Sequence, residues 1–385
     1  MRPLNPAVTD CPPSGIRRFF DIAATMGDVI SLGVGEPDYV TPWRVREAGI
    51  AALEKGLTSY TSNMGLAELR GAVCADLQTR YGVAYEPGTE CVITAGVSEG
   101  LDLALRTLLA PGDEVIIPEP CYVAYGPCVS FAGGTPVYVA TTGGDGFRIH
   151  ADAVEAAVTP RTKAILIASP ANPTGAVQSR AVLEALVDVA VRHDLYVISD
   201  EIYERLVYGM PHTCLPSLAD ARERTVLLGG FSKAHAMTGW RVGYLCAPTA
   251  IAEMACRVHQ YTMLCAPHAS QVAAHEALRA GDQDVHQMVA DYGRRRRFFV
   301  QGLRDIGLDC PEPQGAFYTF PSIMATGLTS QQFAEELLRA ERVAVVPGDV
   351  FGPTGEGHVR ACYATAMPQL EEALTRMGRF VAKHT

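Results

Sequence analysis

Seven short β-rich runs recur between residues 90 and 250, and helical stretches separate them. The runs are CVITA from residue 91, EVIIP from 114, TPVYVA from 135, KAILIAS from 163, LYVIS from 195, TVLLGGF from 225 and RVGYLCA from 241. Several of them are apolar throughout rather than alternating, which is typical of strands that are covered on both faces. The pattern predicts an α/β protein with a mostly parallel, doubly wound sheet of seven strands.

The composition supports a large folded core. Of the 385 residues, 48% are hydrophobic and 19% are charged, and this charged share lies below the roughly 25% usual in soluble domains. Such a chain buries enough apolar surface to exclude intrinsic disorder. The formal net charge of −10 at pH 7 repels phosphate backbones, so we expect no nucleic-acid partner.

Neither a membrane anchor nor a metal centre is expected. No apolar run approaches the ~18 residues of a membrane span. The start, MRPLNPAVTDCPPSG, has no apolar stretch behind its one Arg, so we expect a cytoplasmic protein with no membrane partner. The eleven cysteines include no CxxC pair, which indicates neither a disulfide framework nor a zinc site. We expect them to be reduced and mostly buried.

The character of the chain changes near residue 280, where the series of β-rich runs gives way to helices and shorter strands. The segments QGAFYTF, QQFAEELLRA and HVRACYA follow in this part. We therefore expect a large domain over residues 46–279 and a smaller α+β domain made of residues 1–45 and 280–385.

A run of four arginines, Arg294–Arg297, stands near the start of this second part. We interpret it as the solvated or ion-paired side of a helix rather than as an anion-binding patch. The same helix is expected to point Phe298, Phe299 and Leu303 inward.

Polar residues gather directly after five of the predicted strands. In open parallel sheets, ligands bind beyond the carboxyl ends of the strands, where the connecting loops converge. The five segments are Gly96-Val97-Ser98, Glu119-Pro120-Cys121-Tyr122, SPANPTG from Ser169 to Gly175, Asp200-Glu201-Ile202-Tyr203 and Phe231-Ser232-Lys233. We expect these segments to meet at one site.

Each of these residues could have an ordinary structural role when it is taken alone. Ser98 could cap a helix, Asn172 could form a turn, and Asp200 could belong to an ion pair. Tyr122 could be a core aromatic and Lys233 an exposed lysine. Together they supply a Schiff-base amine, a carboxylate for a ring nitrogen, a stacking aromatic and a helix start suited to a phosphate. Pyridoxal phosphate needs all of these groups.

The segment from Gly230 to Gly243, GFSKAHAMTGWRVG, resembles the lysine-attachment motif of the fold-type I pyridoxal-phosphate enzymes, specifically of the class I/II aminotransferase family. Further segments that resemble this family are SLGVGEPDY, YTSNMGLAELR, ANPTG, SDEIYERLVY and HVRACYA. The resemblance extends over nearly the whole chain, with no large insertion or missing block. The opening residues resemble bacterial aminotransferases of aspartate, aromatic amino acids or N-acetyl-diaminopimelate.

The resemblance implies a set of contacts to the ring of pyridoxal 5′-phosphate. Lys233 would be the catalytic residue and would carry the cofactor as a Schiff base, and Asp200 would pair with the pyridine nitrogen. Asn172 and Tyr203 would hydrogen-bond the 3-oxygen of the ring. Tyr122 would stack on its face.

The resemblance also implies a phosphate site. The backbone at Gly96 and Val97 would hold the phosphate together with the side chains of Ser98, Ser232 and Arg241. Such a helix start, with free N–H groups next to an arginine, is suited to a doubly charged anion.

Two further implications concern the substrate and the assembly. Gly35, Asn172 and Arg360 would receive the substrate's α-carboxylate, and Tyr60 would reach the phosphate of a neighbouring subunit in a homodimer with shared active sites. Simpler roles stay open for three of these residues, because Arg360 could belong to a structural ion pair, Tyr60 could be a loop aromatic, and Gly35 could serve only a turn.

The implied activity is transamination by a ping-pong mechanism, in which the α-amino group of an L-amino acid (aspartate, aromatic or related) is moved to an α-keto acid such as 2-oxoglutarate. The same residues would also suit a pyridoxal-phosphate-dependent C–S β-lyase acting on cystathionine-like substrates, which needs no keto-acid acceptor. A hypothesis of another class is a non-catalytic pyridoxal-phosphate-binding regulatory protein. The sequence identifies neither the donor and acceptor nor a second carboxylate-binding Arg.

Overall fold

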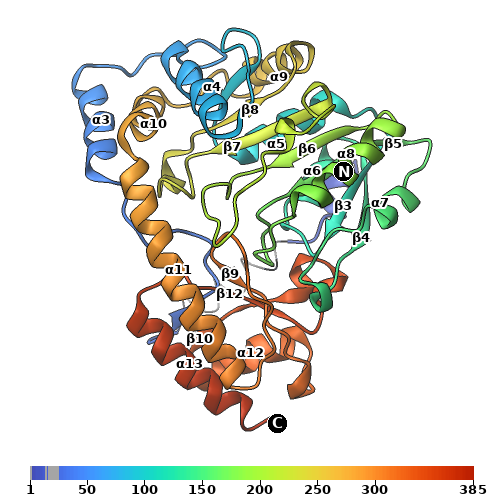
Figure 1. Ribbon diagram of the computed structural model, residues 1–385, viewed down its shortest axis with the longest axis vertical. Helices are drawn as coiled ribbons and strands as arrows, with labels where there is room; N and C mark the ends of the chain where they lie inside the picture. Colours follow the sequence, from blue (N-terminus) through green and yellow to red (C-terminus); the bar gives the residue numbers. More distant parts are fainter. Residues whose placement is uncertain (1, 14, 16–25) are drawn as a thin grey trace.

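The computed structural model describes residues 2–13, 15 and 26–385. Its centre is a seven-stranded sheet in the order β2-β8-β7-β6-β5-β3-β4 (Figure 1). The strands are β2 (Cys91–Thr94), β3 (Glu114–Glu119), β4 (Thr135–Ala140), β5 (Thr162–Ala168), β6 (Tyr196–Asp200), β7 (Thr225–Gly230) and β8 (Gly243–Cys246). β8 runs antiparallel to both of its neighbours, and the other pairs are parallel. The prediction of a mostly parallel sheet made of these seven runs is confirmed.

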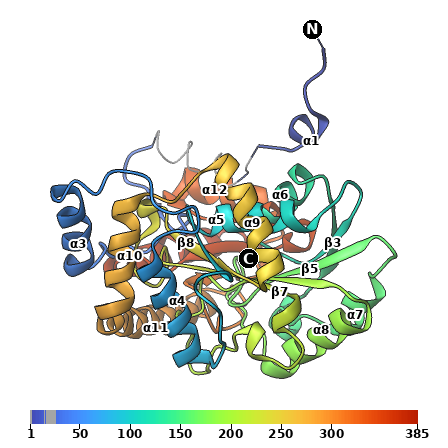
Figure 2. The ribbon, with the colours of Figure 1, turned by 90° about the horizontal axis from the view of Figure 1, so that it is seen from above.

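Helices cover both faces of the sheet, as Figure 2 shows. One face packs against α5 (Val97–Leu108), α6 (Tyr125–Phe131) and α9 (Thr249–Thr262), and the other packs against α7 (Ala151–Ala156) and α8 (Arg180–Arg192). Along β5, Leu166 joins the first cluster, whereas Ile165 and Ile167 join the second. Because successive side chains of a strand point to opposite faces, a strand covered on both sides is apolar throughout.

Three more helices pack beside the β2 end of the sheet. They are α3 (Trp43–Glu54), α4 (Ala67–Tyr81) and α10 (His268–Ala280). α10 contacts both α3 and α4. Near the N-terminus, the short helix α1 (Pro6–Thr9) contacts α6.

The rest of the chain forms a second body from short strands and three longer helices. Its strands are β1 (Ile30–Ser31), β9 (Tyr318–Thr319), β10 (Val343–Ala344), β11 (Val346–Pro347) and β12 (Val359–Cys362). Its helices are α11 (Asp282–Asp305), α12 (Ser330–Glu341) and α13 (Met367–Val381). β11, β12 and β9 form an antiparallel sheet, and β1 pairs with β10 in parallel, with Ile30 opposite Val343. Residues from near both ends of the chain therefore share one sheet.

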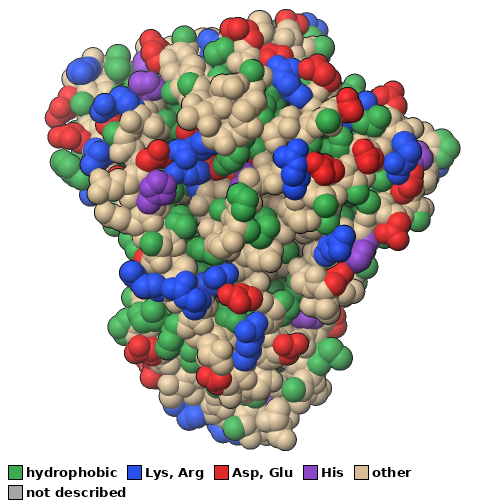
Figure 3. Space-filling view, in the orientation of Figure 1, with side chains coloured by type: hydrophobic (Ala, Val, Ile, Leu, Met, Phe, Trp, Pro, Cys, Tyr) green, Lys and Arg blue, Asp and Glu red, His purple; other side chains and the backbone are tan. Residues whose placement is uncertain are grey.

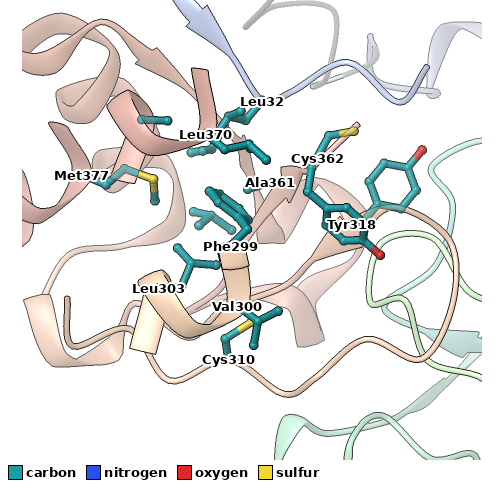
Figure 4. Close-up of a cluster of buried hydrophobic side chains, with 14 of the residues drawn as sticks. Leu32, Phe299, Val300, Leu303, Cys310, Tyr318, Ala361, Cys362, Leu370 and Met377 are labelled. Atoms are coloured by element: carbon teal, nitrogen blue, oxygen red, sulfur yellow. The ribbon is translucent and has the colours of Figure 1, made fainter. Parts of the chain in front are cut away.

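A hydrophobic cluster holds this second body together and also includes Tyr203, Leu206 and Tyr208, which follow β6. Figure 4 shows Leu32 facing Phe299 and Leu303 of α11 and Leu370 and Met377 of α13. The smaller α+β part predicted from the two chain ends is thus present. Its proposed boundaries, 1–45 and 280–385 against 46–279, stay a prediction.

The arginine run on α11 differs in part from the expectation. Arg295 and Arg296 are buried and ion-paired with neighbouring acids, and Phe299 and Leu303 point inward as expected. Phe298, however, is 38% exposed, so its predicted inward position is wrong. At 3.6 residues per turn, the inner side of the helix at this level is already occupied by the two arginines and Phe299. Figure 3 shows a row of basic side chains on the surface of the molecule over this helix.

The remaining expectations concern cysteines, membranes and metals. All eleven cysteines are free, six of them buried and five half-buried. Within residues 2–13, 15 and 26–385, no helix is long and apolar enough to cross a membrane. The same part of the chain contains no group of three or more His, Cys, Asp or Glu side chains placed to hold a metal ion.

Candidate active site

A cavity of about 450 Å³ lies beyond the carboxyl ends of β2, β3, β5, β6 and β7. Its walls come from the five segments that follow these strands and from two parts of the second body. The cavity brings together most of the residues singled out from the sequence: Gly35, Val97, Ser98, Tyr122, Asn172, Asp200, Tyr203, Ser232, Lys233, Arg241 and Arg360.

Lys233 follows β7, and its side chain ends inside the cavity. Its Nζ donates a hydrogen bond of 2.6 Å to the carbonyl oxygen of Gly35. Burial lowers the pKa of the Lys233 ammonium to about 8; the nearby Cys362 opposes this shift, and the guanidinium groups of Arg360 and Arg241 add to it. An ordinary lysine has a pKa of ~10.4 and is almost wholly charged near neutrality. Lys233 therefore has a larger neutral, nucleophilic fraction than an exposed lysine has.

Asp200 is the last residue of β6 and is buried at the floor of the cavity. Its Oδ2 accepts a hydrogen bond of 2.7 Å from the hydroxyl of Tyr125, and its Oδ1 accepts one of 3.2 Å from the backbone N–H of Ile202. Burial raises the pKa of this carboxyl, and the hydrogen bond from Tyr125 opposes the rise. The site thus contains a buried carboxylate that could pair with a cationic group of a ligand.

Arg360, on β12, brings a guanidinium into the cavity from the second body and is only 2% exposed. Its Nη1 donates to Asn172 Oδ1 at 2.9 Å and its Nη2 donates to the carbonyl oxygen of Gly33 at 2.6 Å, whereas its Nε is buried without a partner. Among the described residues no carboxylate pairs with it, so the structure does not support the alternative of a structural ion pair. A buried guanidinium held by neutral acceptors is suited to an incoming carboxylate.

Two tyrosines follow one another beside this arginine in the cavity wall. The Tyr318 ring lies 4.5 Å from the Arg360 guanidinium, and its hydroxyl is 2.8 Å from the hydroxyl of Tyr203. A Cβ at Gly35 would lie 2.4 Å from the Tyr318 hydroxyl oxygen. Glycine at position 35 therefore allows a close approach of the Tyr318 hydroxyl that a side chain would block.

The start of α5 has the geometry of an anion site. The helix begins at Val97 without a side-chain cap, directly after Gly96 with φ +84°. A Cβ at Gly96 would lie 2.6 Å from Arg241 Nη2, and one at Gly243 would lie 2.8 Å from the backbone nitrogen of Val97. The two glycines therefore let the arginine and the free N–H groups of the helix lie close together.

Two of the predicted residues are not in the cavity wall. Gly96 lies just behind it, in contact range of Arg241. Tyr60 is 79% exposed and lies in the connection between α3 and α4, outside the wall. Within a single chain, Tyr60 therefore does not contribute to the cavity of that chain.

Some residues of the site were not predicted from the sequence. Tyr125 and Tyr318 line the cavity, and the carbonyl of Gly33 holds Arg360. Tyr125 stands three residues after Tyr122, and Tyr318 lies in QGAFYTF, but neither segment carries a local signal that points to Asp200 or Arg360.

Comparison with known proteins gives the same class of protein that the cavity suggests. The chain matches the family model for aminotransferase class I and II over residues 27–377. It is 54% identical over 382 residues to YugH of Bacillus subtilis (strain 168), which also carries an aminotransferase name, with 99% of each chain covered. It is 46% identical to an aspartate aminotransferase of Pyrococcus abyssi (strain GE5 / Orsay), with 95% of each chain covered. An aromatic aminotransferase structure from Pyrococcus horikoshii OT3 superposes with a TM-score of 0.91 at 44% identity, covering 95% of this chain and 99% of that one.

The fold, the cavity and these relatives define a fold-type I transaminase, an enzyme that moves an amino group between an amino acid and a keto acid. The chain belongs to the aminotransferase class I and II family.

Proposed function

We propose that this chain is a pyridoxal-phosphate-dependent aminotransferase that acts in the cytoplasm as a homodimer. It transfers the α-amino group of an L-amino acid of the aspartate, aromatic or related kind to an α-keto acid such as 2-oxoglutarate. The observation that carries the proposal is the placement of Lys233, Asp200 and Arg360 around one buried cavity. The relatives' names favour transamination over β-elimination.

The donor set fits pyridoxal phosphate at each of its ends. The uncapped start of α5, with Ser98, Ser232 and Arg241, is suited to the phosphate. At the opposite end, Asp200 is a buried carboxylate, and no cationic side chain of the described residues forms an ion pair with it. Tyr122 lines the cavity between them, where a ring can stack on it.

When it is bound there, pyridoxal phosphate supplies an aldehyde for a Schiff base and a protonated ring that stabilises negative charge at the substrate α-carbon. Asp200 holds the proton on the pyridine nitrogen. The neutral Nζ of Lys233, whose pKa burial lowers to about 8, would accept the proton from the substrate α-carbon as a general base and would deliver it, as a general acid, to the cofactor carbon that carried the aldehyde. Asn172 and Tyr203 orient the ring through its 3-oxygen.

Arg360 fixes the substrate by its α-carboxylate. Its planar fork matches a carboxylate through two parallel hydrogen bonds, and the Tyr318 ring restricts its movement. The guanidinium is held in place by Asn172 and the Gly33 carbonyl, and its unpartnered Nε is available to a carboxylate oxygen.

Tyr60 is assigned to the neighbouring subunit's site. Its exposed position leaves it free to contact the phosphate bound in a second copy of the chain. Light scattering on the full chain is expected to give a dimer, and Tyr60→Phe is expected to weaken cofactor binding while the dimer persists. A monomeric, fully active protein would contradict this part of the proposal.

The covalent attachment gives the first test. Borohydride reduction of the protein loaded with pyridoxal phosphate, followed by digestion and mass spectrometry, should place the label on Lys233. A label on another residue, or no label, would refute the proposal.

The reaction itself is tested with a panel of amino donors against 2-oxoglutarate, pyruvate and oxaloacetate. Turnover is expected to require the keto acid, and Lys233→Ala should abolish it. Release of ammonia without an acceptor would instead indicate β-elimination. A cofactor absorption that does not respond to any donor would indicate a non-catalytic binding protein.

A further inference from the structure

Resting on the proposed function, we propose that Tyr125 is a positioning residue of this site. Its hydroxyl holds the Asp200 carboxylate in the orientation and charge state that a protonated pyridine nitrogen requires. Tyr125 is not among the residues to which the sequence points.

The contacts of Asp200 are few. Its carboxylate receives the Tyr125 hydroxyl at 2.7 Å and the Ile202 N–H at 3.2 Å. The first of these is the shorter bond and the only one of the two from a side chain. Since the Ile202 N–H belongs to Asp200's own strand end, the Tyr125 hydroxyl is the donor that holds the carboxylate from a different element, α6.

The surroundings make this bond important for the charge of the carboxylate. Burial raises the pKa of Asp200, and the neighbouring Glu201 raises it further, whereas Tyr125, the Ile202 N–H and Lys233 lower it. A hydrogen bond to the ionised form of a buried acid favours that form. Losing it would therefore shift Asp200 toward the neutral acid, which cannot hold a proton on a ring nitrogen.

Tyr125 is itself firmly placed. It is the first residue of α6 and is 3% exposed. Its ring packs edge-on against Tyr122 with centroids 5.5 Å apart and an interplanar angle of 84°. Burial raises the pKa of its hydroxyl well above the ordinary value, and Asp200 adds to the rise, so the group remains a donor. The same side chain thus contacts both the acid and the aromatic that would touch the cofactor ring.

The test compares two probes that cannot react with Lys233. The first is 4′-deoxypyridoxine 5′-phosphate, which lacks the aldehyde but keeps the ring nitrogen, the 3-hydroxyl and the phosphate. The second is its benzene analogue, in which CH replaces the ring nitrogen. Titration calorimetry on the full-length apoprotein measures the affinity of each probe.

Tyr125→Phe removes only the hydroxyl and keeps the ring beside Tyr122. It is expected to weaken binding of the nitrogen-containing probe by about 10- to 150-fold, the usual effect of a hydrogen bond to a charged group. The affinity for the benzene analogue should change by less than about threefold, because its binding does not depend on the charge of Asp200. Tyr85→Phe is the matched control, since Tyr85 is 6% exposed and its buried hydroxyl has no partner among the described residues. It should leave both affinities unchanged.

A double-mutant cycle with Asp200→Asn separates positioning from a general loss of stability. A stability effect of Tyr125→Phe would weaken binding in both backgrounds, whereas a positioning effect should disappear once Asp200 is replaced. Equal losses for the two probes, or additive losses in the cycle, would overturn the inference. If the wild-type chain binds neither probe, the proposed function fails as well; if it binds and Tyr125→Phe behaves like Tyr85→Phe, only this inference fails.

Discussion

Replacing Arg360 with lysine tests how the substrate is held, because the positive charge is kept while the fork is lost. Arg360 makes two charge-assisted hydrogen bonds, of 2.9 and 2.6 Å, to two acceptors that lie on different segments. An ammonium has no planar pair of donors and cannot reproduce two parallel bonds to a carboxylate. Losing one such bond costs about 1.5–3 kcal/mol, or about 10- to 150-fold.

Arg360→Lys is therefore expected to lower kcat/KM for the amino donor by about 10- to 150-fold. Arg360→Leu should lower it by about 30- to 4,000-fold, since truncating a partner of a buried charge pair costs about 2–5 kcal/mol. Steady-state kinetics with the best donor and with 2-oxoglutarate measure both half-reactions. Since every amino acid and keto acid presents the same α-carboxylate, both half-reactions should be affected.

The matched control is Arg296→Lys. Arg296 is also buried and stacked on an aromatic ring, 4.8 Å from the ring of Tyr208, and donates to the carbonyl oxygen of Pro313 at 2.7 Å. It lies outside the cavity wall, so it should lower thermal stability with little change in kcat/KM. A change of less than threefold in Arg360→Lys, or an equal loss in the control, would refute the reasoning.

Three further predictions concern single residues. Lys233→Met should stabilise the apoprotein most below pH 8 and less as the pH rises to 10.5, because burial lowers the pKa of this lysine from 10.5 to about 8 in the folded chain only. Urea unfolding of both proteins at several pH values measures this difference in stability, and a difference that does not change with pH would contradict the prediction. Burial lowers the pKa of His235 to about 3, so the folded protein should lose stability as the pH falls below 6.5, where the unfolded chain takes up a proton. His235→Gln should reduce that loss in the same assay, and an unchanged loss of stability at acid pH would argue against the prediction. Gly96→Ala should weaken cofactor binding by at least about tenfold, because φ at this position is +84° and the new Cβ would lie 2.6 Å from Arg241 Nη2. The control Gly71→Ala, in open space on α4, should leave binding unchanged and raise the stability of the protein by about 0.5–1 kcal/mol. Fluorescence titration measures the affinity for the cofactor, and equal affinities in the two variants would speak against a phosphate site at the start of α5.

The sheet could be predicted from the sequence because both of its faces are buried. Ile165, Leu166 and Ile167 are all apolar, although they point alternately to the two helical layers. That pattern is local in the sequence and needs no knowledge of the partners. Asp200 and Lys233 then fall at the same edge of the sheet, because both follow the carboxyl ends of parallel strands and that edge depends only on strand direction.

What the sequence could not provide depends on contacts between distant segments. Tyr125 meets Asp200 across 75 positions, and nothing in its own segment marks it for that contact. The inward prediction for Phe298 was wrong because it relied on the apolar character of the residue rather than on the phase of the helix, which Arg295 and Phe299 decide. The role proposed for Tyr60 involves a second copy of the chain, which one sequence does not place.

The parallel pairing of β1 with β10 also has a consequence for how the protein is made. Ile30 leaves the ribosome 343 − 30 = 313 residues before Val343, the residue beside which it must lie. At roughly 5–20 residues per second, translation of that stretch takes about 15–60 s. During this interval the nascent β1 segment has no β10 to pair with, and the Gly33 carbonyl that follows it reaches Arg360 only once nearly all of the polypeptide has emerged.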